Sequence, residues 1–215
     1  SVLTFGRFMG IRALQIISFI LISMCTNASA EVTLTFAEDL KRVHYHTCIS
    51  DANIDKIWNG SRKGYRKLSN VKVNGKKATP SQFGIKLDGA KTSCVEFDIQ
   101  IESKSRRRSM SVPNVAYINT QSLSWLPFIQ HKRQPTQFNI LLPENTQLSA
   151  PWEKEDQSFA LGRTPLHWGG LVVVGNVNVS EIPLSSNALR VTIVNATEER
   201  QKALRQWIGD MAKAV

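Results

Sequence analysis

The sequence contains none of the short motifs that carry common enzyme chemistry. It has no H-E-x-x-H, no G-x-S-x-G, no phosphate-cradling glycine loop and no dinucleotide-binding fingerprint. Histidine is scarce, with four residues at positions 44, 46, 131 and 167. The chain therefore lacks the residues that most hydrolase mechanisms need. We expect no catalytic residue, no resident metal and no cofactor in this chain, and no enzymatic activity of its own.

Acidic residues are missing from the first thirty positions. Arg7 and Arg12 precede an apolar stretch over residues 13–25, and small residues lead up to Ala30. A cationic start, a short apolar stretch and a small-residue ending are typical of a secretory signal peptide. Residues 1–30 are predicted to be a leader cleaved after Ala30, so that Glu31 begins an exported protein, periplasmic or secreted.

Long apolar runs are missing as well. A membrane-spanning helix needs about 20 apolar residues, and the run over residues 13–25 is shorter than that. A retained membrane anchor or a buried core helix is the alternative to cleavage. With the leader removed, we expect no membrane span.

Cysteine is equally sparse, and its use depends on the compartment. The sequence has three cysteines, of which Cys25 lies in the leader and Cys48 and Cys94 remain. In an oxidising compartment such a pair favours a structural disulfide. Closing a loop of this length would stabilise the fold by roughly 4 kcal/mol in the chain-entropy model. Two separate buried thiols are the alternative.

Positive charge exceeds negative charge, with 27 Lys and Arg against 17 Asp and Glu. Both leader charges are cationic, so removing them lowers the net charge from +10 to +8. A basic protein favours anionic partners. The densest cationic segment, Lys104 to Arg108, has no aromatic residue that could stack on a base, and it reads as a solvated loop. An anionic envelope surface is therefore a candidate partner, whereas nucleic acid is not expected.

In much of the remaining sequence, apolar and polar residues alternate as they do in β-strands. In Cys94–Ile101, apolar residues at odd positions alternate with polar residues at even ones, which predicts a strand with one buried face. The run Val71–Val73 enters Asn74-Gly75, a typical tight hairpin turn, with Phe83–Leu87 as the expected partner strand. Further strands are expected at residues 31–36, 43–48, 115–118, 137–142, 158–161, 171–179 and 189–194, and residues 102–113 are expected to form a charged loop. The fold class predicted is mainly β: an antiparallel β-sandwich-like domain with a C-terminal amphipathic helix.

The last residues change from a period of two to a helical period. The segment Asn195-Ala196-Thr197-Glu198 has the form of a helix N-cap with an acidic partner three residues on. An apolar stripe then follows at helical spacing, formed by Leu204, Trp207, Ile208, Met211 and Val215. The expected organisation is a signal peptide over 1–30, a β-sandwich-like domain over 31–194, and a helix over 195–215 that either docks on the sheet or starts a further domain.

Three local clusters are candidate sites, each with a structural alternative. His44, His46 and Cys48 would project from one face of a strand and could supply zinc ligands, but Cys48 is also the obvious partner of Cys94. An acidic cluster beside Trp152 consists of Glu153, Glu155 and Asp156, and it is weighed as a carboxylate pair against a solvated loop. Leu166-His167-Trp168-Gly169-Gly170 could line a ligand groove, although a tight turn with a packed indole explains it equally. The tryptophans at 58, 125, 152 and 168 are expected mainly in the core.

The order of these features resembles the N-terminal region of exported zinc metallopeptidases of the glycyl-aminopeptidase-like, gluzincin kind. The resemblance rests on the run Cys94–Ile99, the element Trp125-Leu126-Pro127, the strand Phe138–Pro143, the pair Gly169-Gly170, the strand Leu189–Val194, and Arg205-Gln206-Trp207-Ile208 in the closing segment.

The resemblance implies a β domain that supports a thermolysin-like catalytic domain, which would hold zinc through H-E-x-x-H. None of those zinc-binding residues occurs in this sequence, so no catalytic position is carried over. The chain would then be a fragment of a larger zinc aminopeptidase, with the catalytic domain as its partner. The alternative function is a stand-alone periplasmic or secreted binding module for an anionic glycan or envelope surface.

Overall fold

The computed structural model describes residues 30–51, 53–101, 109–112, 114–129, 132–133, 136–155, 158–161, 170–184, 188–194 and 196–213. It is mainly β, with several antiparallel sheets and one long helix near the C-terminus, which confirms the fold class predicted from the sequence. None of the helices in these ranges has the length and apolar character required to cross a membrane.

The largest element is an eight-stranded sheet in the order β14-β15-β12-β1-β2-β7-β4-β5. Its strands are β1 (Ala30–Phe36), β2 (Arg42–Ile49), β4 (Leu68–Val73), β5 (Lys76–Lys77), β7 (Ser93–Gln100), β12 (Thr136–Leu141), β14 (Glu153–Glu155) and β15 (Ser158–Leu161). Neighbouring strands run antiparallel except β1 and β12, which pair in parallel. The first described strand therefore lies in the middle of the sheet, between β12 and β2.

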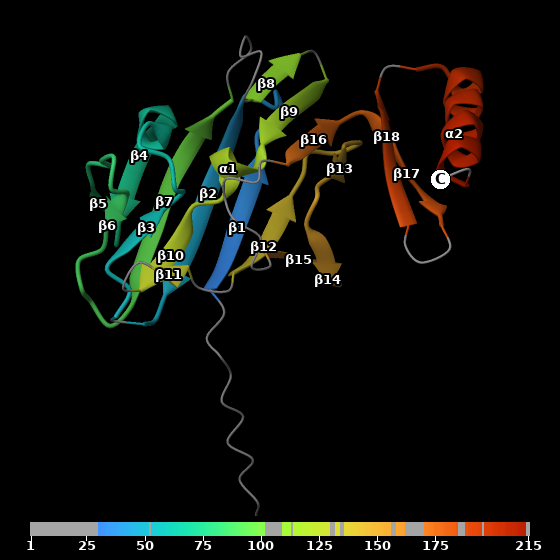
Figure 1. Ribbon diagram of the computed structural model, residues 1–215. Helices are drawn as coiled ribbons and strands as arrows, with labels where there is room; N and C mark the ends of the chain where they lie inside the picture. Colours follow the sequence, from blue (N-terminus) through green and yellow to red (C-terminus); the bar gives the residue numbers. More distant parts are fainter. Residues whose placement is uncertain are drawn as a thin grey trace, which may run out of the picture.

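Two four-stranded sheets form the second layer, in the orders β11-β10-β3-β6 and β13-β16-β9-β8. Their strands are β3 (Lys56–Trp58), β6 (Ile85–Lys86), β8 (Ser109–Val112), β9 (Val115–Asn119), β10 (Leu126–Ile129), β11 (Lys132–Arg133), β13 (Gln147–Ser149) and β16 (Leu171–Gly175). Two short helices connect strands, the 3-10 helix η1 (Gly64–Lys67) and α1 (Thr120–Leu123). Figure 1 shows this layer across one face of the large sheet, and one core cluster joins the buried side chains of both layers.

Three aromatic side chains fill the centre of this core. Tyr45 of β2 stacks on Phe97 of β7 with ring centroids 4.3 Å apart, and Trp125 meets Phe97 edge-on at 5.5 Å. The Tyr45 hydroxyl, fully buried, donates a hydrogen bond of 2.7 Å to the backbone oxygen of Trp125. Burial raises the pKa of the Tyr45 phenol well above its usual range. The bond therefore joins the two layers through a neutral, fully satisfied hydroxyl.

Replacing Tyr45 with Phe tests this hydrogen bond. The substitution keeps the ring and its stacking but leaves the Trp125 oxygen without its donor. We expect the free energy of unfolding to fall by about 1–2 kcal/mol, the cost of an unsatisfied buried acceptor. Urea unfolding followed by circular dichroism measures it. An unchanged midpoint with an unchanged slope would show that the bond contributes nothing to stability.

The last elements are a hairpin and a helix at the side of the sandwich. Strands β17 (Val177–Pro183) and β18 (Ala188–Val194) make a two-stranded sheet, and α2 (Glu198–Lys213) packs against β17 (Figure 1). A side chain at Gly209 would approach Ile182 to 3.6 Å, which shows how closely the helix lies to the strand. The boundary predicted after residue 194, between the β domain and the helix, stays a prediction. It would assign the hairpin β17–β18 to the β domain and α2 to the segment that follows.

The helix has the predicted type but begins differently. We expected a cap at Asn195, whereas the backbone N–H of Arg200 donates to the Thr197 hydroxyl at 3.4 Å, so Thr197 caps a helix that begins at Glu198. The apolar residues expected on one buried face of the helix are not all buried. Leu204 and Ile208 are half-buried, while Trp207 and Met211 are 62% and 55% exposed. Val215 lies outside the described residues.

Two expectations for strands are wrong in detail. Asn74-Gly75 does form a tight turn with positive φ at both residues, but β4 turns there into Lys76–Lys77. The expected partner, Phe83–Leu87, contains β6, which pairs instead with β3. The charged loop expected over 102–113 contains β8, whose pairing with β9 the alternation of side chains did not reveal. Residues 102–108 lie outside the described residues.

Candidate functional site

The titratable side chains of β2 gather on the outer face of the large sheet. Along β2 the side chains alternate, so that His44, His46 and Cys48 are exposed on one face and their neighbours enter the core. This is the shared face that the spacing predicts. The register places His44 opposite Asp98 and His46 opposite Glu96 on β7, so histidines and carboxylates form two cross-strand rows. We call this set the outer polar face.

Asp98 is the centre of the first row, although only 7% of the residue is exposed. Its Oδ1 lies 2.9 Å from His44 Nδ1, and its Oδ2 accepts a hydrogen bond of 2.7 Å from Asn70 Nδ2. The Arg42 guanidinium adds a more distant charge at 4.0 Å. A nearly buried carboxylate is thus fully partnered, as burial of a charge requires.

Asn70 reaches Asp98 because β4 is irregular at this point. The register between β4 and β7 shifts between Ser69 and Lys72, and Asn70 has a φ of 55°. Asparagine is among the few residues that tolerate this left-handed conformation. The irregularity therefore places an amide donor over a carboxylate on the neighbouring strand.

Acidification tests the Asp98 network. Burial opposes ionisation, yet hydrogen bonds from His44 and Asn70 outweigh it and hold the pKa of Asp98 below its usual 3.8. Because the folded pKa is depressed, the stabilisation is present above the unfolded pKa and is lost as pH falls through the folded value. We expect Asp98→Asn to cost about 1–2 kcal/mol at pH 7 and much less near pH 2.5, measured by urea unfolding. An equal cost at both pH values would contradict the charge-based account.

In the second row, Glu96 forms an ion pair with Lys72, its neighbour on the other side in β4. Lys72 Nζ lies 2.7 Å from Glu96 Oε1, and the hydrogen bond from Lys72 lowers the pKa of Glu96 despite slight opposing desolvation. The Lys72 side chain is exposed and that of Glu96 is half-buried, and pairs so open to water contribute little to stability. This ion pair therefore adds little to the stability of the fold.

The two cysteines close the end of the outer polar face. Cys48 and Cys94 stand directly opposite each other in the β2–β7 pairing and form a disulfide, with Cα atoms 4.0 Å apart. This is the pairing that the sequence favours. The His46 Nε2 atom lies 3.8 Å from Cys48 Sγ. A disulfide sulfur is not a thiolate ligand, so Cys48 is unsuited to the zinc site considered for these residues.

Among the described residues, no group of three His, Cys, Asp or Glu side chains is placed to hold a metal ion. His44 is engaged with Asp98, and no hydroxyl or thiol in the described part of the chain is hydrogen-bonded to that imidazole. A His–Asp pair without an attached nucleophile lacks one member of a hydrolytic triad. The arrangement suits structural stabilisation of the sheet.

The other candidate clusters are only partly described. Glu153 and Glu155 belong to β14, and Asp156 lies outside the described residues, as do residues 166–169 of the glycine-tryptophan segment. Trp125 and Trp152 are buried, at 1% and 7% exposure, as expected of core tryptophans. Trp58 is half-buried and packs against the core, and Trp168 falls outside the description.

One small pocket was not anticipated from the sequence. A cavity of about 130 Å³ lies between η1 and α1, with Trp125 and the buried Asn59 among its lining residues. Asn59 Oδ1 accepts from the Ser61 N–H at 3.0 Å, which folds the Asn59-Gly60-Ser61 turn against the sandwich. The sequence around Asn59 predicted a loop. It could not predict that α1, about sixty residues later in the chain, packs beside that loop.

Comparison with known proteins gives similarity to solved structures. No protein-family model and no curated protein matches the chain. The crystal structure of an aminopeptidase N family protein from Idiomarina loihiensis aligns with a TM-score of 0.61 and 13% sequence identity, covering 81% of this chain and 34% of that one. Yeast LTA4 hydrolase in complex with bestatin aligns with a TM-score of 0.28 and 10% identity, over 72% of this chain and 29% of that chain, too low to carry an argument.

The similarity to the Idiomarina protein establishes a shared fold. It confirms, at the level of fold, the resemblance to gluzincin metallopeptidases found in the sequence. The chain spans about a third of the length of that protein.

Proposed function

We propose that this chain is the non-catalytic N-terminal structural domain of an exported metallopeptidase-like protein. The observation that carries the proposal is the fold shared with about a third of an aminopeptidase N family protein. Fold alone does not define activity, so the role is argued from the surface as well. Catalytic residues would belong to another part of the same polypeptide, and this domain would hold that part in place.

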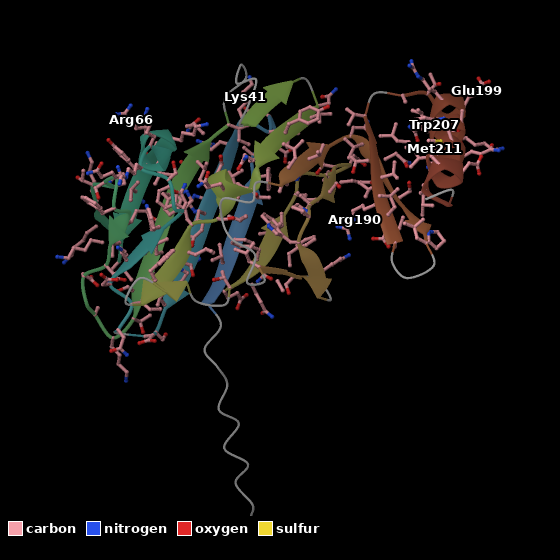
Figure 2. The ribbon with its side chains drawn as sticks, viewed as in Figure 1. Lys41, Arg66, Arg190, Glu199, Trp207 and Met211 are labelled. Atoms are coloured by element: carbon pink, nitrogen blue, oxygen red, sulfur yellow. A yellow bond between two sulfur atoms is a disulfide. The ribbon has the colours of Figure 1, made fainter. Side chains whose placement is uncertain are left out.

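The exposed side of α2 supports a docking role. Trp207 and Met211 are four residues apart, so they lie on the same side of the helix and expose a large apolar area to solvent. Figure 2 shows both side chains on α2, with Glu199 near the start of the helix. Exposed apolar patches of this kind mark interaction surfaces. The occupant we propose is the catalytic domain of the same protein.

The native polypeptide tests the proposal. An antibody against residues 31–194 would isolate the protein from its host, and mass spectrometry would give its N-terminus and its length. We expect a polypeptide about three times as long that contains H-E-x-x-H and begins at Glu31. A native product that ends near residue 215, with no peptidase sequence attached, would overturn the structural-domain role. An intact leader on cytosolic protein would overturn export alone.

Variants at the helix face test the docking surface. Replacing Trp207 and Met211 with serine in the whole protein is expected to weaken the attachment of the catalytic domain by about 2–3 kcal/mol, since two anchoring apolar contacts are lost. Thermal inactivation of peptidase activity measures the effect, with Glu199→Ser as the matched control on the same helix. Equal inactivation temperatures for the double variant and the control would place the catalytic domain elsewhere.

Binding to an anionic glycan or envelope surface stays a prediction from the charge balance.

A further inference from the structure

The positive charge of the chain is concentrated in one segment, residues 56–91. This segment has ten lysines and arginines and a single acidic residue, Asp88. Outside it the chain has 17 cationic and 16 acidic residues, which nearly cancel. The excess of positive charge is therefore a property of one part of the molecule and is not spread over its whole surface.

The segment folds into one end of the sandwich. It forms η1 and the strands β3, β4, β5 and β6, which Figure 1 shows together at that end. β5 is the outermost strand of the large sheet, and β6 is the outermost strand of one sheet in the second layer, so both layers have an edge here. Residues 78–84 connect these two edges. The charge therefore gathers around two sheet edges that a short connection joins.

The lysines at these edges are not neutralised by acidic neighbours. Lys76, Lys77 and Lys86 are exposed, and none of them forms an ion pair with a described residue. Lys86 stands directly opposite Lys56 in the β3–β6 pairing, and like charges in that position destabilise a sheet. The carboxylate of Asp88 accepts its hydrogen bonds from neutral side chains. Positive charge left uncompensated in this way attracts an anionic surface.

Phe83 projects from the connection between the two edges. It is 69% exposed, more than any other large apolar side chain in the described part of the chain. The turn over residues 81–84 is fixed: Ser81 and Gly84 exchange backbone hydrogen bonds of 3.0 and 3.1 Å, and the Phe83 N–H donates to the Ser81 hydroxyl at 3.2 Å. Gly84 has a φ of 107°, and a Cβ there would lie 2.3 Å from the Ile57 oxygen, so the turn lies against β3. The turn therefore holds the Phe83 ring in solvent.

Two simpler explanations account for only part of this surface. Lysines at sheet edges prevent edge-to-edge aggregation, and single exposed apolar residues are common. Protection of an edge gives no reason, however, for an exposed ring between two edges. It also leaves the charge on η1 unexplained, where Arg66 is exposed at the same end of the molecule (Figure 2). Cations around an exposed aromatic ring are the combination that binds an anionic lipid surface.

We propose that this end of the sandwich binds the surface of a membrane that contains anionic phospholipid. Lys76, Lys77 and Lys86 approach the lipid phosphates, and the Phe83 ring enters the boundary between head groups and acyl chains. A lipid surface is favoured over a soluble polyanion because only the lipid offers an apolar layer to the ring. The proposal does not depend on the peptidase assignment, since it uses only residues 56–91.

Cosedimentation with lipid vesicles tests the proposal. The protein used is residues 31–215, which omits the apolar stretch of the predicted leader and keeps every described residue except Ala30. We expect it to bind vesicles of phosphatidylcholine and phosphatidylglycerol about tenfold more tightly than vesicles of phosphatidylcholine alone. Added salt should weaken the binding, because it screens the lysines. Equal binding to the two kinds of vesicle, or no binding to either, would overturn the proposal.

A pair of aromatic variants tests the role of the ring. Phe83→Ser should weaken binding to the anionic vesicles about tenfold, since the ring no longer leaves water. The matched control is Trp207→Ser, which removes a similarly exposed ring from α2 and should leave the binding unchanged. If Phe83→Ser binds as tightly as the parent protein, this end of the molecule holds polyanions by charge alone and the membrane proposal is wrong.

A pair of charge variants tests the lysines. Replacing Lys76 and Lys77 together with glutamine should weaken the binding about tenfold, whereas replacing Arg200 and Lys202 of α2 with glutamine should not. Far-ultraviolet circular dichroism of each variant shows that the fold is retained. Equal loss of binding from the two double variants would mean that the net charge of the protein, and not this surface, attracts the vesicles.

Discussion

Replacing Cys48 and Cys94 together with serine is expected to lower the free energy of unfolding by about 4 kcal/mol. The disulfide joins residues 46 positions apart, and a cross-link over such a loop restricts the unfolded chain by about that amount. The loop contains β3 to β6, so these strands lose their covalent tether to the centre of the large sheet. In a protein of this size the melting temperature should fall by roughly 8–16 °C.

Scanning calorimetry of the double variant and of the parent chain measures this loss. Serine is chosen because Cys48 is exposed, so that the new hydroxyls meet water. Treating the parent chain with dithiothreitol should reproduce the shift, while the double variant should not respond to it. If the parent chain melts at the same temperature with and without reductant, the bond contributes nothing to stability.

Replacing Trp125 with alanine is expected to cost about 3–5 kcal/mol. Trp125 is 1% exposed, and its indole meets Phe97 edge-on at the centre of the core. Removing it loses the transfer free energy of the ring and leaves a cavity that the packed strands fill only in part. The backbone oxygen that accepts the Tyr45 hydroxyl also loses its fixed position.

The matched control is Trp207→Ala on α2. Its indole is 62% exposed, so the same substitution should change the stability of this chain by less than about 0.5 kcal/mol. Urea unfolding followed by circular dichroism compares the two variants. Similar costs at both positions would mean that the core is not centred on Trp125.

Strands with a clear alternation were predictable, and very short strands were not. β7 buries the apolar side chains of Val95, Phe97 and Ile99 as its alternation predicts, but Asp98, which the same pattern places on the solvent face, is nearly buried as well. By contrast β5, β6 and β11 are two residues long, and β3 and β13 are three, too short for any periodicity to show. The hairpin partner of β4 was misjudged because two exposed lysines carry no strand pattern.

The outer polar face was partly predictable for a related reason. The sequence places His44, His46 and Cys48 on one face of β2, because spacing along a strand fixes the face. It does not reveal Asp98 as the partner of His44, since that depends on the register between β2 and β7. The pocket between η1 and α1 is more remote still from any local pattern, because it needs residues 59–67 and residues 119–125 to meet.

The parallel pairing of β1 with β12 constrains the order in which the protein folds. Residues 30–35 need residues 136–141 beside them, more than a hundred positions later in the chain. During synthesis, one edge of β1 therefore stays open until residue 141 has left the ribosome, and only then can β12 join the large sheet. Pairing between such distant segments is intrinsically slow. Until then the backbone groups along that edge of β1 have no strand beside them, and an open strand edge of this kind is a place where another chain could pair.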